Sequence, residues 1–133
     1  MTIDTWSPAS NTEKESIDKK FLQRCLEIAE CDQLNELDLA LTDEEKKKSS
    51  IMHAKQAIWE ETLQSFSDDQ LVSLIRFFTI AEMQLSGWQA GNESPVIAIN
   101  QILKSRGNKL DKAMLMWIRE NSSNRFIPNG AVL

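Results

Sequence analysis

Apolar residues recur every three or four positions along most of the chain, which is the spacing of one face of an α-helix. The first such stretch covers residues 13–41, and its apolar positions are Ile17, Phe21, Cys25, Ile28, Cys31, Leu34, Leu37 and Leu41. Their mean spacing of about 3.4 residues is typical of a helical bundle or coiled-coil seam. The pattern predicts either one long helix or two helices with a break near Asp32–Asn35.

Two capping-box patterns predict where the next helices begin. A Ser or Thr followed three residues later by Glu or Gln occurs at Thr42–Glu45 and at Ser67–Gln70. The first predicts a helix over residues 43–65, with His53 on its polar face. One side of that helix would carry Ile51, Met52, Ile58, Trp59, Thr62, Leu63 and Phe66. The second predicts a helix that runs to about Leu85 and is apolar around most of its circumference, as expected of a central helix.

Two more helices and a final extended segment are expected after residue 87. Ser94 as N-cap and Pro95 at the first helical position start a fourth helix, which Gly107 ends. Asp111 caps a fifth helix that runs to about Asn121. Residues 122–133 mix turn-forming with apolar residues, so we expect an extended C-terminal strap that lies over the helices.

The distribution of glycine and proline fixes the predicted fold class. Neither residue occurs between Ala9 and Ser86. Strand-rich domains need frequent turns, which depend on these residues, whereas helix interiors exclude them. We therefore expect an all-α protein: a single-domain bundle of about five helices over residues 13–133, with an extended C-terminal strap. Residues 1–12 are polar and are expected to form a flexible N-terminal tail.

Composition adds limits on location and redox state. The chain has 133 residues and a formal net charge of −5. No apolar run approaches the roughly 20 residues that span a bilayer, and the first residues lack the features of a signal peptide. We therefore expect a cytoplasmic protein that does not contact membranes. Cys25 and Cys31 would point in different directions on a helix, so we expect two buried, reduced cysteines rather than a disulfide.

A lysine and a glutamate fall on predicted apolar helix faces. Lys55 lies within the apolar arc of the second helix, and Glu82 lies among Phe78, Ile75 and other apolar residues of the third. One hypothesis is a buried Lys55–Glu82 pair at the floor of a small-molecule-binding or catalytic pocket. The favoured alternative is structural: Lys55 reaches solvent, and Glu82 accepts hydrogen bonds from the loop around Trp88.

The loop over residues 87–93 is the main candidate for binding a partner. Gly87 and Gly91 flank Trp88, and Gln89 and Asn92 add polar groups. Loops on rigid scaffolds often carry binding residues. The favoured alternative is that Trp88 folds back to cover the end of the third helix.

The C-terminal strap is a second candidate segment, through Asn124, Arg125 and Phe126. We expect the loop around Trp88, this strap and the basic edge over residues 104–125 to form the working surface. That edge holds six basic and two acidic residues. Two helices joined by a short turn there resemble a DNA-binding helix-turn-helix in outline, but the mixed charge makes a weak nucleic-acid binder only an alternative.

The side chains available for catalysis are few. The chain has one histidine and no tyrosine, and no Ser/His/Asp, Cys/His or Glu-x-x-His arrangement is evident. No catalytic residue, metal or cofactor is therefore expected. The sequence favours a non-catalytic binding or regulatory module that contacts another protein or a second copy of itself.

Overall fold

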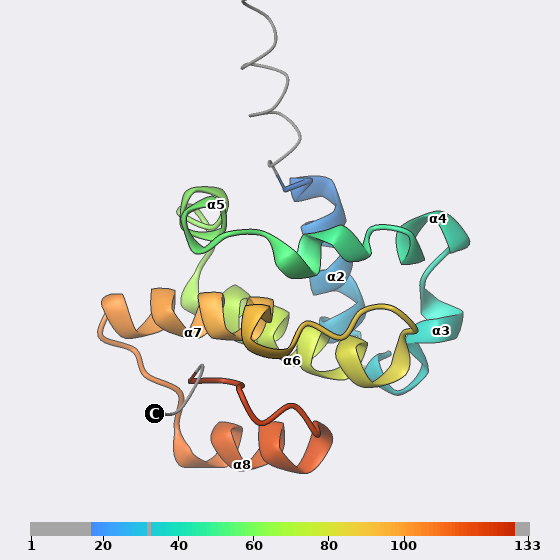
Figure 1. The fold of residues 1–133 in the computed structure, drawn as a ribbon. Coiled ribbons are helices and arrows are strands. Elements are labelled where there is room, and N and C mark those ends of the chain that lie inside the picture. The colour runs from blue at the N-terminus through green and yellow to red at the C-terminus, as the bar shows by residue number, and fades with distance from the viewer. Residues whose placement is uncertain (1–16, 32, 130–133) are drawn as a thin grey trace, which may run out of the picture.

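The structure, a computed structural model, describes residues 17–31 and 33–129, and over these residues it is all-α, with helices and turns but no strand. The predicted tail over residues 1–12 and the predicted helix start near residue 13 lie outside the described residues. The α-helices are α2 (Lys19–Glu30), α3 (Leu37–Ala40), α4 (Asp43–Lys46), α5 (Gln56–Thr62), α6 (Asp68–Gln84), α7 (Pro95–Ser105) and α8 (Lys112–Asn121). Three 3-10 segments join them: η1 (Leu34–Glu36), η2 (Ser49–His53) and η3 (Gly91–Glu93) (Figure 1).

Helix α6 is the central element, as its apolar circumference predicted. Helices α2, α3, α7 and α8 all pack against it, and α5 packs on α7 (Figure 1). Its side chains Phe77 and Phe78 are fully buried, with ring centroids 5.2 Å apart, and Trp59 of α5 lies edge-on to Phe78 at 5.6 Å. Burial of an aromatic side chain contributes a few kcal/mol. The core therefore forms around α6.

The three longer helices after residue 67 begin at the caps that the sequence predicted. Ser67 and Gln70 form a complete capping box at the start of α6. The Ser94 hydroxyl accepts from the Val96 amide, and the Asp111 carboxylate accepts from the Met114 amide. Each cap satisfies backbone amides that have no partner within the helix.

The predicted helix over residues 43–65 is wrong. Helix α4 ends at Lys46, η2 follows, and α5 begins only at Gln56, because the backbone is extended at Ala54 and Lys55. Met52 of η2 and Trp59 of α5 are both fully buried. The Lys46 carbonyl left by the break accepts a hydrogen bond from Trp88 Nε1 at 3.0 Å. Tertiary packing thus overrides the local helical pattern.

The sequence left open whether residues 13–41 form one helix or two. In the described part of this stretch the chain forms separate elements. Helix α2 ends at Glu30, and η1 and α3 follow. Gln84 of α6 holds this turn: its side-chain oxygen accepts from the Leu37 amide, and its nitrogen donates to the carbonyls of Leu34 and Asn35. Seven α-helices are therefore described where about five were predicted. The bundle arrangement and the single domain stay predictions.

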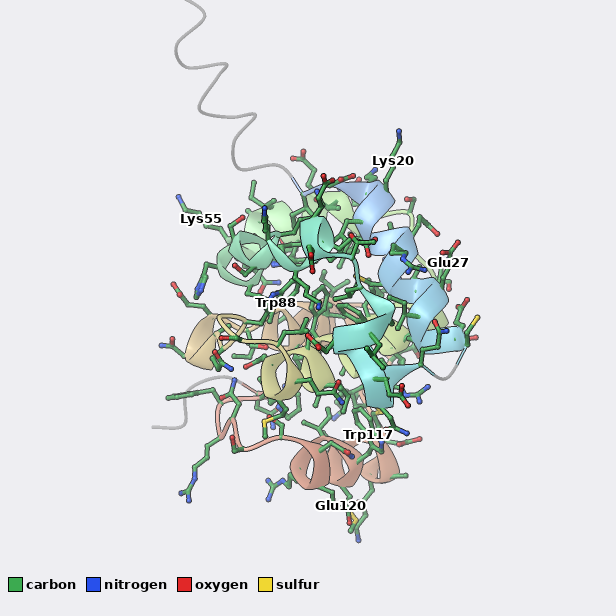
Figure 2. All side chains as sticks on the ribbon, turned by 90° about the vertical axis from the view of Figure 1, so that its right-hand side faces the viewer. Lys20, Glu27, Lys55, Trp88, Trp117 and Glu120 are labelled. Carbon is green, nitrogen blue, oxygen red and sulfur yellow. The ribbon has the colours of Figure 1, made fainter. Side chains whose placement is uncertain are left out.

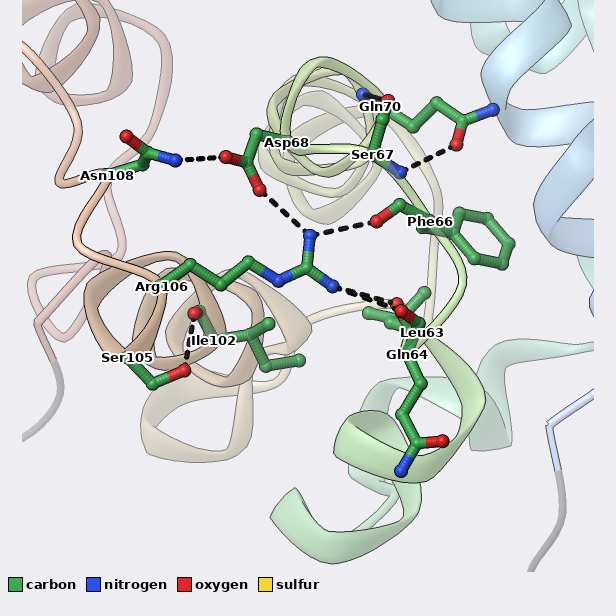
Figure 3. A network of polar contacts seen from close by, with 10 residues as sticks. All are labelled: Leu63, Gln64, Phe66, Ser67, Asp68, Gln70, Ile102, Ser105, Arg106 and Asn108. Atoms are coloured by element: carbon green, nitrogen blue, oxygen red, sulfur yellow. Dashed lines mark hydrogen bonds and ion pairs between the residues drawn. The ribbon is translucent and has the colours of Figure 1, made fainter.

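Arg106, just after α7, ties the end of α5 to the start of α6 (Figure 3). Its guanidinium donates to the carbonyls of Phe66, Leu63 and Gln64 and pairs with the Asp68 carboxylate at 2.8 Å. The planar guanidinium suits several acceptors at once. One basic residue therefore satisfies carbonyls that the end of α5 leaves without helical partners.

The strap over residues 122–129 returns across the helices. Ile127 and Pro128 are buried, and Asn100 of α7 donates to the Pro128 carbonyl at 3.0 Å. Lys104 donates to the Asn129 side chain. The segment packs over the helices as predicted, but residues 125–129 form turns rather than the extended strap that the sequence predicted, and residues 130–133 lie outside the described residues.

The two cysteines differ, so the prediction of two buried thiols is wrong for one of them. Both are free; Cys25 faces the core, whereas Cys31 is exposed at the end of α2. Burial raises the pKa of the Cys25 thiol well above its usual value, and the nearby Glu45 carboxylate raises this pKa further. Cys25 is therefore a protonated core side chain.

In the described part of the chain, no helix has both the length and the hydrophobicity needed to cross a membrane.

Candidate functional site

The Glu82 carboxylate joins three segments of the molecule. It projects from α6, is only 4% exposed, and accepts from Ser94 Oγ at 2.5 Å and from Asn124 Nδ2 at 2.9 Å. The Ala90 amide lies 3.4 Å from the same carboxylate. These donors supply the compensation that a buried carboxylate requires. The expected hydrogen bonding of Glu82 by the loop around Trp88 is confirmed, and the strap adds a donor that the sequence did not indicate.

Lys55 lies elsewhere and does not pair with Glu82. It is the exposed N-cap residue of α5, and Figure 2 shows its side chain projecting from the surface. The predicted helix face that carried Lys55 does not exist, because the chain is extended between η2 and α5. The two residues therefore do not share a pocket floor.

Trp88 offers no aromatic face to a partner. The side chain is fully buried, and the centre of its ring lies 6.2 Å from the centre of the Phe21 ring. Its Nε1–H donates a hydrogen bond to the Lys46 carbonyl. Trp88 therefore folds inward, as in the favoured alternative, but its side chain contacts Phe21 of α2 and Lys46 at the end of α4, and its covering of the end of α6 stays a prediction. Its role is to link the α6–α7 loop to α2 and to the end of α4.

Gln89 and Asn92, from the same loop, are both exposed, but they differ in use. Gln89 Nε2 donates to the carbonyls of Glu82 at 3.0 Å and Leu85 at 3.4 Å. It therefore satisfies carbonyls at the C-terminal end of α6. Asn92 lies in η3 at the surface.

The strap contacts this loop through the side chain of Asn124. Asn124 Nδ2 donates to the Gly91 carbonyl at 3.0 Å as well as to Glu82. The Asn124 side-chain oxygen accepts from the Phe126 amide, which fixes the turn. Arg125 is exposed, and Phe126 is 39% exposed. The structure therefore brings the predicted loop and strap together through Asn124.

Met83 is a neighbour of the strap that sequence reasoning missed. Its side chain is 49% exposed, and its sulfur lies 3.4 Å from the Ser123 amide. We call the exposed group Met83, Asn92, Arg125 and Phe126 the loop–strap surface. The sequence indicates only an N-cap role for Ser94, but its hydroxyl also donates a hydrogen bond to Glu82.

The basic edge over residues 104–125 is partly committed to internal contacts. Arg106 binds backbone carbonyls and Asp68, and Lys104 binds Asn129. A DNA-binding surface needs cations that face phosphate groups. Two of the six basic side chains therefore serve the fold, which weakens the nucleic-acid alternative.

His53 is exposed, as expected, and its Nδ1 lies 2.7 Å from a Glu93 carboxylate oxygen. Over residues 17–31 and 33–129, no group of three or more His, Cys, Asp or Glu side chains is arranged to hold a metal ion.

Comparison with known proteins gives no match for this chain, whether with family models, curated proteins or solved structures.

Proposed function

We propose that this chain is a non-catalytic binding module that contacts another protein through the loop–strap surface. The observation that carries the proposal is the Glu82 carboxylate, which accepts from both the α6–α7 loop and the strap. A surface whose backbone is fixed in advance loses less conformational entropy when a partner binds.

The exposed residues of this surface have the composition of an interface. Aromatic residues, methionine and arginine are enriched at protein interfaces, and the surface has one of each: Phe126, Met83 and Arg125. The positive charge of Arg125 favours a partner with an apolar patch beside a carboxylate. Self-association through the same residues is the second form that this function could take.

The direct test removes the exposed side chains without touching the Glu82 contacts. Phe126→Ala and Arg125→Glu should each reduce the amount of a cross-linked partner, or of a cross-linked second copy, by about tenfold, the size of effect expected of a 1.4 kcal/mol contact. Leu39→Ala is the matched control, because Leu39 is an apolar side chain of α3 that is 78% exposed. The variants are cross-linked in the cells that produce them, and quantitative mass spectrometry then measures the amount of each cross-linked partner. If the three variants capture the same proteins in the same amounts, the proposal is wrong.

The Glu82 junction itself gives a stability prediction. Glu82→Leu should lower the free energy of unfolding by about 1–3 kcal/mol, because Ser94 and Asn124 lose a buried acceptor. Glu82→Gln keeps one acceptor oxygen and should cost less. Urea denaturation monitored by circular dichroism compares the two. Equal stability of both variants and wild type would show that this carboxylate does not hold the loop and strap.

A further inference from the structure

Met83 belongs to the loop–strap surface and also holds the beginning of the strap. Its Sδ lies 3.4 Å from the Ser123 amide nitrogen and 3.6 Å from Ser123 Oγ, and both groups donate to the sulfur. The Met83 side chain is nevertheless 49% exposed. A thioether that small molecules in solution can reach therefore attaches the strap to the last turn of α6.

Two other methionines provide a comparison within the same chain. Met116 of α8 is 50% exposed, almost the same as Met83, and its sulfur has no hydrogen-bond partner among the described residues. Met52 is fully buried in the core. An oxidant has to reach the sulfur, so Met83 and Met116 are open to it and Met52 is not. The two exposed methionines therefore differ mainly in what their sulfur atoms contact.

The contacts of Met83 leave one side of its sulfur open. A thioether sulfur has two lone pairs, which accept weak hydrogen bonds and also react with oxidants. The amide and the hydroxyl that donate to Met83 belong to one residue, so they approach the sulfur from the same side. An oxidant therefore meets the lone pair on the other side.

We propose that Met83 is a site of reversible oxidation by hydroperoxides, and that its oxidation detaches the beginning of the strap from α6. The open lone pair of the sulfur attacks the terminal oxygen of the hydroperoxide, R–O–O–H. The S–O bond forms as the O–O bond breaks, and the proton of the transferred oxygen moves to the leaving oxygen, which departs as ROH. The sulfur loses two electrons and the peroxide gains them. Methionine sulfoxide reductases reverse the reaction, with one type of enzyme for each sulfoxide epimer.

The new oxygen changes both the strap and the surface. Because it is added on the open side, it points away from Ser123, and the sulfur that faces the two donors acquires a partial positive charge. The contacts with the Ser123 amide and hydroxyl then become unfavourable. The sulfoxide is also polar, so the loop–strap surface loses an apolar side chain. A weaker contact with a partner protein rests on the proposed function, whereas the detachment of the strap does not.

The stereochemistry of oxidation tests the site on the full chain. After brief treatment with hydrogen peroxide, one Met83 sulfoxide epimer should exceed the other by at least about fourfold, because one lone pair is covered. Met116 should give its two epimers within about twofold of each other. The protein is digested, the peptides are treated with each stereospecific reductase, and mass spectrometry shows which enzyme restores each methionine. Equal amounts of both epimers at Met83 would overturn the proposal.

A matched pair of variants assigns the change in the strap to Met83. Met116→Leu keeps Met83 as an exposed methionine, and Met83→Leu keeps Met116. Oxidation of Met116→Leu should make hydrogen exchange of the Ser123 amide, followed by NMR, at least about threefold faster. Oxidation of Met83→Leu should leave this rate nearly unchanged, because the amide has already lost its sulfur acceptor. The reductase that acts on the Met83 epimer should restore the slower exchange.

Unchanged exchange of Ser123 after oxidation of Met83, or an equal acceleration in the two variants, would also overturn the proposal. Circular dichroism of both oxidised variants checks that each is folded. The cross-linking test of the proposed function uses Phe126→Ala and Arg125→Glu, neither of which alters the Met83 sulfur. Failure of that test would therefore remove the partner and leave the oxidation site to be judged by epimer ratio and exchange.

Discussion

Residues 34–66 and residues 67–121 are both helical, yet they are stabilised in different ways. The second region consists mainly of α6, α7 and α8, which have 17, 11 and 10 residues. The first contains α3, α4 and α5, which have 4, 4 and 7 residues, together with two 3-10 segments. The first region nevertheless contains no glycine and no proline.

The difference lies in which groups satisfy the backbone at the helix ends. In the second region, Ser67, Ser94 and Asp111 each bond an amide two or three residues away. In the first region, Thr42 and Glu45 form a local capping box, but several other backbone groups are satisfied by side chains from far along the chain. Such donors are Arg24 to the Ala40 carbonyl, Gln84 to Leu34 and Asn35, Trp88 to Lys46, and Arg106 to Leu63, Gln64 and Phe66.

The absence of glycine and proline from residues 34–66 therefore does not make this stretch one continuous helix. Short helices have low intrinsic stability, so their ends depend on tertiary partners. Side-chain donors from distant residues make several breaks possible within residues 34–66. They form hydrogen bonds to backbone carbonyls that each break leaves without a helical partner.

The largest expected effect comes from α6, which packs against elements of both regions. Phe78→Ala should lower the free energy of unfolding by about 3–5 kcal/mol through lost burial and a residual cavity. His53→Ala, at an exposed ion pair, should cost no more than about 1 kcal/mol. Urea denaturation measures both. A larger cost at His53 would contradict the central position of α6.

Removal of Arg106 tests the long-range donors directly. Arg106→Met should cost about 2–3 kcal/mol, because several carbonyls and Asp68 lose a charged donor. Arg119→Met changes an exposed arginine of α8 in the same way and should stay within about 0.5 kcal/mol. Equal costs in thermal unfolding would show that the carbonyls after α5 need no such partner.

Gln84→Ala should separate the two regions. The loss of its bonds to Leu34, Asn35 and Leu37 should cost about 1–2 kcal/mol. Amide hydrogen exchange should speed up in residues 34–40 and stay unchanged in α7. Uniform acceleration across both regions would mean that residues 34–40 do not open separately.

The two fully buried tryptophans offer the finest comparison. Trp88 Nε1 donates to Lys46, whereas Trp59 Nε1 is buried with no hydrogen-bond partner among the described residues. Trp88→Phe leaves a carbonyl without its donor, but Trp59→Phe removes an unsatisfied donor. Trp88→Phe should therefore be the costlier change by about 1 kcal/mol in chemical denaturation. If Trp59→Phe proves the costlier change, the hydrogen bond from Trp88 to Lys46 does not stabilise the fold.

Sequence patterns predicted the features that are local. The all-α class, the starts of α6, α7 and α8, and the burial of Glu82 among apolar neighbours follow from residues close together in the chain. The breaks at Lys46–Gln56 and the contact between Asn124 and Glu82 depend on residues about 42 positions apart. Periodicity cannot show such pairs, because it describes one helix face at a time.

The placement of the two cysteines gives the protein a single natural labelling position. With Cys25 buried and its thiol held in the protonated form, a maleimide dye at neutral pH should attach to Cys31 alone. Cys31 lies three residues before η1, beside the turn that Gln84 holds. A fluorophore there would report the local opening of residues 34–40 in the wild-type chain, with no engineered cysteine.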